Sequence, residues 1–140
     1  MKKELQSKLL EKYPEFFEYL KEHEGPIIPI QFGFECHDGW YWLIDTLMDT
    51  ISSYCKNNEV ESINIIQIKE KYSSLRFYYS GGDTMIDGMV WLAEHQSYHI
   101  CEFCGTTENI GYTEGWVYTI CEKCHKEGED NVKGLEWNPK

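Results

Sequence analysis

Four of the six cysteines in this chain of 140 residues form two Cys-x-x-Cys pairs. The pairs are Cys101/Cys104 and Cys121/Cys124, and sixteen residues lie between them. Two thiolates three positions apart can turn toward one ion when the backbone makes a tight knuckle, and Gly105 permits that turn. This spacing is typical of zinc sites. We therefore predict that all four bind Zn²⁺, and we expect a structural role because four thiolates leave no position for a catalytic water.

Redox activity or an iron–sulfur cluster would fit the two cysteine pairs less well than zinc binding does. A thioredoxin-like redox site would use one pair in a βαβ context, which the sequence lacks. An iron–sulfur cluster would use four cysteines, but their spacing here differs from the ferredoxin patterns. His125 follows Cys124 directly and could replace one ligand, although we interpret it as a bystander.

The N-terminal sequence predicts the compartment. Residues 1–7 are charged and lack the apolar segment of a secretory signal peptide. We therefore expect a cytoplasmic protein, in which disulfides are disfavoured and the isolated Cys36 and Cys55 are bystanders. No stretch approaches the ~18 apolar residues of a membrane span, so we expect no membrane partner.

Charge narrows the classes of partner. The chain has 13 Lys and Arg against 24 Asp and Glu, a net charge of -11, while 41% of its residues are hydrophobic and 15% aromatic. The apolar content predicts a folded core rather than an acidic disordered tail. Long nucleic acids are excluded as partners, because their phosphates repel so acidic a surface. When the chain is divided into residues 1–60, 61–80, 81–100 and 101–140, only the segment 61–80 carries a net positive charge.

That basic stretch has the period of a β-hairpin. Residues 62–72 and 75–80 are rich in Ile, Tyr and Phe, and Ser73-Ser74 separates them as a two-residue turn. This turn places Lys71 opposite Arg76 and Lys69 opposite Tyr78. Alternation then predicts an apolar face of Ile66, Ile68, Tyr72, Leu75, Phe77 and Tyr79 and a polar face of Gln67, Lys69, Lys71, Arg76 and Tyr78. Glu70 falls on the apolar face, which indicates a shifted register or a bulge.

The polar face is a candidate ligand site. Lys69, Lys71 and Arg76, with the Tyr78 hydroxyl, could hold a phosphate or a carboxylate, and Asp38 is a candidate neighbour of this site. In the alternative interpretation the three cations pair with surrounding carboxylates, such as Glu35 or Asp38.

Three amphipathic helices are expected to position these residues. The first spans residues 2–23 with an interruption at Pro14, the second spans 39–57 with Asp38 as its N-cap, and the third spans 84–96 with Asp83 as its N-cap. The sequence thus predicts an α+β fold of about three helices packed on a small antiparallel hairpin or sheet, followed by a zinc ribbon. We divide it into a core (1–99), the ribbon (100–126) and a polar tail (127–140), loose apart from Leu135 and Trp137.

Two further groups have residue types that could do chemistry. Residues 35–38 combine a carboxylate, Cys36, His37 and Asp38, but neighbours in sequence rarely point at one reacting atom, so we expect a helix cap with turn residues. His95 and His99 have the spacing of metal ligands, but no third ligand is evident, and we expect solvent-facing positions.

The combined motifs resemble a family of small uncharacterised bacteriophage and bacterial proteins. The motifs are residues 36–40 (CHDGW), 69–79 (KEKYSSLRFYY), 100–105 (ICEFCG) and 121–124 (CEKC), against a Gly-Asp-Gly-Trp-like turn, a Lys-Glu-Lys-Phe-Gly-Gly-Leu-Arg-Phe-Tyr-like hairpin and a C-terminal zinc ribbon. His37 stands where Gly is usual, and Ser73-Ser74 replaces Gly-Gly. The resemblance covers most of residues 30–125 and implies no activity.

These observations favour a zinc-containing binding protein. We expect its partner to be a protein, such as a host protein if the chain is phage-encoded, or a small anionic ligand such as a signalling nucleotide. The alternative is an enzyme that acts on a small phosphorylated substrate through Asp38, His37 and the Lys69/Lys71/Arg76 face.

Overall fold

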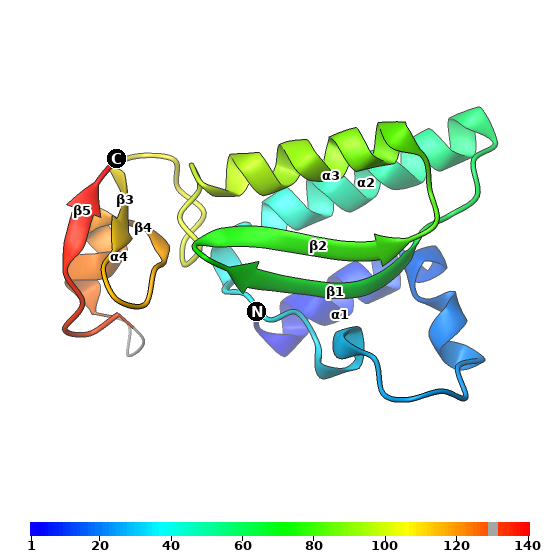
Figure 1. Ribbon diagram of the computed structural model, residues 1–140, viewed down its shortest axis with the longest axis horizontal. Helices are drawn as coiled ribbons and strands as arrows, with labels where there is room; N and C mark the ends of the chain where they lie inside the picture. The colour runs from blue at the N-terminus through cyan, green and yellow to red at the C-terminus, as the bar shows by residue number, and fades with distance from the viewer. Residues whose placement is uncertain (129–131) are drawn as a thin grey trace.

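Helices and two small antiparallel sheets form an α+β fold, as predicted, in the computed structural model, which describes residues 1–128 and 132–140 (Figure 1). The α-helices of this described part are α1 (Lys3–Lys12), α2 (Tyr41–Asn58), α3 (Thr84–Ser97) and α4 (Glu122–Glu127). One sheet pairs β1 (Asn64–Lys71) with β2 (Ser74–Ser80). The other has the order β4 (Thr119–Cys121), β3 (Ile110–Thr113), β5 (Trp137–Pro139).

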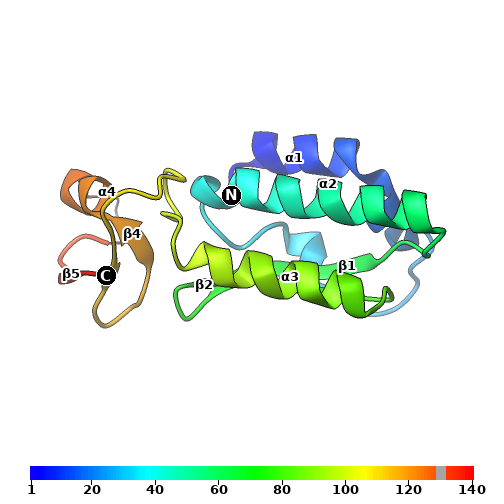
Figure 2. The ribbon, with the colours of Figure 1, turned by 90° about the horizontal axis from the view of Figure 1, so that it is seen from above.

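The first sheet and the longer helices make the body of the molecule. Helix α3 contacts both β2 and α2, and Figure 2 shows α1 on the other side of α2. Large side chains with no exposed surface fill the space between these elements, among them Leu9, Phe16, Trp40, Ile44, Met48, Ile51, Ile63, Ile65, Ile68, Leu75 and Ile86. A second apolar cluster lies in the part of the chain after residue 100, which we call the C-terminal module. Among the described helices, none has the length and apolar character that crossing a bilayer requires.

Both edges of the β1–β2 hairpin are covered. The Ser97 hydroxyl and the Glu94 carboxylate of α3 accept hydrogen bonds from the backbone N–H groups of Leu75 (2.9 Å) and Phe77 (2.9 Å) on β2. On the β1 side, Glu35 exchanges backbone hydrogen bonds with the strand. The edge groups are therefore satisfied within the chain, and the hairpin is held in one position.

The N-terminal helix is shorter than predicted. Helix α1 ends at Lys12, and residues 14–16 and 18–21 form 3-10 turns. Pro14 has no N–H to continue the α-helical ladder, so it starts the first of these turns instead. The apolar residues of the segment still face the core, since Phe16 and Phe17 are buried.

One predicted helix cap is confirmed and one is wrong. The Asp83 carboxylate accepts from the N–H groups of Met85 (3.0 Å) and Ile86 (3.1 Å) at the start of α3. Helix α2 begins at Tyr41 without a side-chain cap, after a 3-10 turn over Asp38–Trp40. The Asp38 carboxylate is instead held by Lys2, through its backbone N–H (2.7 Å) and its ammonium group (3.0 Å).

The predicted hairpin is present, but its register differs. The turn residues are Tyr72 and Ser73, both with positive φ, so Lys69 pairs with Arg76 and not with Tyr78. Because the turn moves by one residue, the strand positions opposite each other shift by two, and the predicted polar face is preserved. A bulge between Ile65 and Gln67 places Ile65 rather than Ile66 on the buried face.

The end of the chain is more ordered than predicted. Trp137–Pro139 form β5, which pairs with β3, and the Trp137 indole N–H donates to the Ile120 carbonyl (3.1 Å). The prediction of a loose end is therefore wrong for Asn138 and Pro139, because the β3 edge offers them a backbone partner, whereas Trp137 was expected to be ordered. Residues 129–131 of the predicted tail lie outside the described residues.

The turn geometry predicts opposite effects for two adjacent serines. Ser73 has φ of 63°, and relief of its strain by glycine, at about 1–2 kcal/mol, exceeds the entropic cost of glycine. Ser73→Gly should therefore raise the free energy of unfolding, measured in urea, by about 0.5 kcal/mol. Ser74 lies in β2 and donates to the Lys71 carbonyl (3.0 Å). Ser74→Gly should lower stability by about 1 kcal/mol, and the same sign for both variants would contradict this turn.

Candidate metal centre

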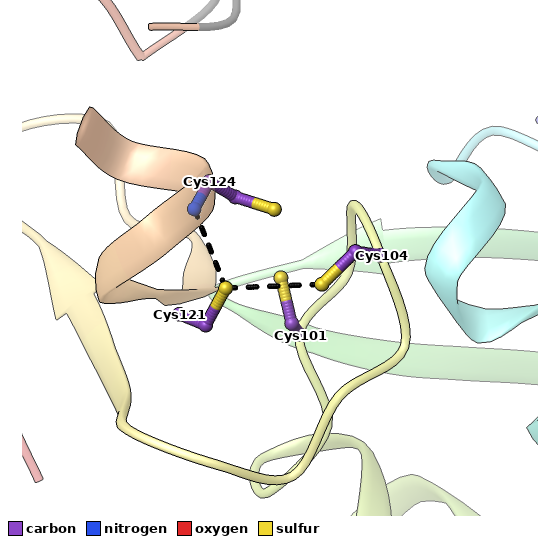
Figure 3. A group of neighbouring side chains, drawn as sticks. All are labelled: Cys101, Cys104, Cys121 and Cys124. Atoms are coloured by element: carbon purple, nitrogen blue, oxygen red, sulfur yellow. Dashed lines mark hydrogen bonds between the residues drawn. The ribbon is translucent and has the colours of Figure 1, made fainter. Parts of the chain in front are cut away.

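The four paired cysteines converge on one point, where their Sγ atoms all lie within 4.8 Å of one another (Figure 3). Cys104 Sγ and Cys121 Sγ, from different pairs, are 3.7 Å apart. Tetrahedral zinc with Zn–S bonds of about 2.3 Å requires sulfur atoms about 3.8 Å apart. The observed distance therefore allows both sulfur atoms to bind the same metal ion. The distance is too long for a disulfide, and all the cysteines are free thiols.

A tight turn shapes the first pair, as predicted. Gly105 has φ of 80° and donates its N–H to the Cys101 carbonyl (2.9 Å). The Cys101 N–H donates to the Thr106 carbonyl (2.8 Å) and closes the turn from the other side. We call residues 101–106 the knuckle. A side chain at position 105 would be strained at this φ, so glycine allows the knuckle to form.

The second pair lies where a strand meets a helix. Cys121 ends β4, and its Sγ accepts from the backbone N–H of Cys124 (3.4 Å) in the first turn of α4 (Figure 3). A backbone N–H directed at sulfur stabilises its thiolate form, which is the form that binds metal. The junction of β4 and α4 therefore orients both thiols toward the first pair.

The thiols differ in acidity. Burial raises the pKa of Cys101 to about 11, and burial together with a hydrogen bond to Cys104 raises the pKa of Cys124. Burial also acts on Cys104, but the Thr106 backbone N–H and its contacts with the other thiols lower its pKa overall. A divalent cation would stabilise the thiolate form of all four.

The two isolated cysteines have no such neighbours. Burial raises the pKa of Cys36 to about 12 and also raises the pKa of Cys55. Both are buried, protonated thiols of the apolar core. Among the described residues, the four paired cysteines are the only group of three or more His, Cys, Asp or Glu side chains placed to hold a metal ion.

The knuckle rests directly on the body at Gly39. The Gly39 N–H donates to the Glu102 carbonyl (2.7 Å), and a Cβ built on Gly39 would lie 2.3 Å from the Cys101 carbonyl oxygen. Trp40 adds a bond from its indole N–H to the Ile100 carbonyl (3.0 Å). The glycine of the Asp-Gly-Trp motif is thus needed for backbone-to-backbone contact.

His37 strengthens the same contact. Its Nδ1 lies 2.8 Å from Glu102 Oε1, and its backbone N–H donates to the same oxygen (3.1 Å). Its ring stacks on Phe103 with centroids 4.1 Å apart. The prediction that residues 35–38 cap a helix is therefore wrong, because His37 clamps the knuckle and Asp38 binds Lys2.

The remaining histidines make local contacts. His95 Nδ1 lies 3.0 Å from the Trp91 carbonyl, and His99 is exposed beyond the end of α3. Both side chains are exposed, as expected. His125 Nε2 lies 2.8 Å from the Leu135 carbonyl and is outside the cysteine group, as expected for a bystander.

The candidate ligand residues on the hairpin are only partly brought together. Arg76 forms an ion pair with Glu94 (3.8 Å), and Asp38 is engaged by Lys2. The Lys69 ammonium lies over the Tyr78 ring, 5.6 Å from its centroid. Glu35, the other expected partner, accepts from Gln67. Lys69 and Lys71 remain together at the tip of the hairpin.

Those two lysines line a cavity that the sequence did not predict. The cavity has a volume of about 380 Å³ and lies between the hairpin and the β3–β4 connection, with Lys69, Glu70, Lys71, Tyr72, Gly115, Trp116 and Val117 as its lining. Arg76, Tyr78 and Asp38 are not part of this lining. The sequence contained one feature that could have indicated this cavity. Trp116 is a large aromatic residue in a polar bend, a place where packing of the core does not require one.

Two glycines test the contact between knuckle and body. Gly39→Ala should lower the free energy of unfolding by about 3 kcal/mol, because the added Cβ forces the two backbones apart. The matched control is Gly88→Ala in α3, where an added Cβ meets nothing within 4 Å. That change should raise stability by about 0.5–1 kcal/mol, since alanine favours a helix. Urea denaturation measures both, and a Gly39→Ala protein as stable as the parent would contradict the contact.

No family model matches the chain, and no match was found among curated proteins or solved structures. The resemblance to the phage and bacterial family stays a prediction. The function must therefore be inferred from two features of the structure. These are the four convergent thiols and the cavity lined by two lysines and a tryptophan.

Proposed function

We propose that the four cysteines bind a structural zinc ion and that the C-terminal module so formed completes a binding site for a small anion at the hairpin tip. The observation that carries the proposal is the cavity between Lys69 and Lys71 on one side and the Gly115–Val117 connection on the other. An intracellular location, which keeps thiols reduced, belongs to the same proposal.

The cysteine group has the ligand set of a structural zinc site. Four thiol groups within 4.8 Å of one another suit Zn²⁺, and four thiolates would complete its coordination shell. A closed shell has no position for water or substrate, so the ion stabilises the fold and does not act on a ligand. Such sites contribute about 10–16 kcal/mol at neutral pH, which exceeds the stability of most single domains.

The metal would position the cavity through the strands between the two cysteine pairs. Strands β3 and β4 and their connection lie between Cys104 and Cys121. The Thr113 hydroxyl donates to the Trp116 carbonyl (2.7 Å) and accepts from the Tyr118 N–H (2.9 Å), which holds the connection in one conformation. The Thr119 hydroxyl then donates to the Ser73 carbonyl (2.8 Å) in the hairpin turn. One wall of the cavity is thereby joined to the other.

The charge of the cavity favours an anion. Within the described part of the chain, neither Lys69 nor Lys71 forms an ion pair, although the protein carries a net charge of -11. Ammonium groups without a carboxylate partner can bind a phosphate or carboxylate without first breaking an ion pair. A small ligand also avoids the repulsion that a long polyanion would meet on the rest of the surface.

The geometry favours binding over catalysis at this site. The enzyme alternative requires Asp38 and Arg76 beside the two lysines, but Lys2 holds Asp38 and Glu94 holds Arg76. The lining of the cavity therefore offers cations and aromatic rings that can hold a ligand, but it does not include Asp38 or Arg76, on which the enzyme alternative depends.

The zinc proposal predicts one zinc ion per chain. Metal analysis of the purified protein should give a ratio near one, and Cys121→Ser should lower it sharply because a ligand is lost. Cys55→Ser, which removes a buried thiol outside the group, should leave the ratio unchanged. A strong chelator should unfold the C-terminal third, and lower pH should release the ion as the thiolates are protonated. An unchanged melting curve after verified removal of zinc would contradict the structural role.

The anion proposal predicts where a simple phosphate binds. Ribose 5-phosphate, added in an NMR titration, should shift the amide signals of residues 69–72 and 115–117. Replacing both lysines, Lys69→Gln with Lys71→Gln, should weaken binding at least about ten-fold, because two charge-assisted contacts are lost. Lys8→Gln on α1, which also removes an exposed charge but does not line the cavity, serves as the control. Equal weakening by the control would show a nonspecific charge effect and overturn the proposed site.

A further inference from the structure

We infer that the anion bound in this cavity carries a planar aromatic ring and is a nucleoside monophosphate or a close relative. The inference rests on the proposed anion site and names the class of its ligand. It depends on the aromatic side chains, the position of Glu70 and the size of the cavity, which are separate from the two lysines.

Two large aromatic side chains line the cavity and remain accessible. Tyr72, at the hairpin turn, is 78% exposed, and Trp116, in the β3–β4 connection, is 65% exposed. An exposed aromatic residue beside a cavity offers a π-face on which a base can stack, and such stacking is independent of base sequence. The two residues belong to different walls of the cavity. The Lys71 ammonium lies over the Tyr72 ring, 5.5 Å from its centroid, so the positive charge and an aromatic side chain are next to each other on the hairpin wall.

Trp116 differs from the other exposed tryptophans. Trp91 is 60% exposed, but its ring lies against His95 with centroids 3.9 Å apart. Trp42 contacts the Tyr41 ring at 5.5 Å. Among the ring contacts of the described residues, none involves Trp116. Its face is free for a ligand, while its backbone is held by Thr113.

The lining of the cavity includes polar groups of both charges. Lys69 and Lys71 project from the same face of β1 and supply the positive charge. The partly buried Glu70 carboxylate also lines the cavity, and its Oε1 accepts from the Ser73 N–H (2.7 Å). A carboxylate repels a second anionic group but accepts hydrogen bonds from amino or hydroxyl groups. A nucleoside monophosphate supplies a phosphate for the lysines and a base or sugar donor for Glu70.

Size and charge favour one nucleotide over a polymer. A volume of about 380 Å³ lies within the range of small-ligand pockets. The strongly acidic chain would repel the neighbouring phosphates of a long strand. The cavity is therefore suited to a single nucleotide, with its base between two aromatic walls.

The test compares two probes that share a sugar phosphate. AMP and ribose 5-phosphate differ in the base, so their affinities, from calorimetry and NMR titration of the zinc-loaded protein, report base recognition. We expect AMP to bind the parent protein at least about ten-fold tighter than ribose 5-phosphate, as one stacked base allows. Trp116→Ala should weaken AMP at least about five-fold and leave ribose 5-phosphate within about two-fold. Trp91→Ala removes an equally exposed indole from α3 and should change neither affinity.

Each other outcome has a defined meaning. If AMP and ribose 5-phosphate bind equally tightly at residues 69–72 and 115–117, the aromatic ligand class is wrong and the anion site stands. If neither probe shifts those signals, the anion site is wrong and the inference fails with it. If a short oligodeoxyadenylate binds tighter per molecule than AMP with added contacts outside the cavity, single-nucleotide recognition is overturned.

Zinc content and circular dichroism of Trp116→Ala show whether this variant is folded. Trp116→Phe, which keeps an aromatic ring, should restore most of the AMP affinity.

Discussion

The contact of Gly39 with the knuckle is the constraint on which the rest of the structure depends. It joins two backbones at a distance that only glycine allows, since a Cβ at position 39 would lie within 2.6 Å of the Gly105 nitrogen as well as against Cys101. Close-packed backbones cannot slide as side chains can, so the contact determines how the C-terminal module lies on the body. The stacked pair of His37 and Phe103 then restricts rotation about this point.

A second contact closes the arrangement at the hairpin. The Thr119 hydroxyl donates to the Ser73 carbonyl in the hairpin turn, and this bond is buried, as is Thr119 itself. Two separated contacts hold a rigid module in a single orientation. The cavity lies between the elements joined in this way. For the ligand that we propose, a cavity formed in advance would reduce the entropy lost on binding.

Predictions that depend on neighbouring residues were correct, and predictions that distant residues could change were not. Local signals were sufficient for α3, because the Asp83 cap acts on the residues directly after it, and for the Cys-x-x-Cys pairs, because a metal site needs ligands at a short spacing. Asp38 had the same local signal as Asp83, but Lys2 lies closer in space and takes its carboxylate. The hairpin turn lies one residue earlier than predicted. In this position β2 directs the N–H groups of its free edge to Ser97 and Glu94 of α3, and the alternation of residue types contains no information about such bonds.

The sequence by itself determined the fold class, the four candidate metal ligands, two strands and their polar face, and the net negative charge. These properties depend on residue types and short spacings, which remain the same however the chain folds. Tertiary structure decided which polar residues meet. It gave Arg76 and Asp38 partners from distant elements and left both outside the lining of the cavity, although Arg76 lies opposite Lys69 on the hairpin. It also brought Trp116 to the lysines across more than forty positions. The physical reason is that ion pairs and cavity walls form between surfaces, and surfaces exist only after helices, strands and turns have packed together.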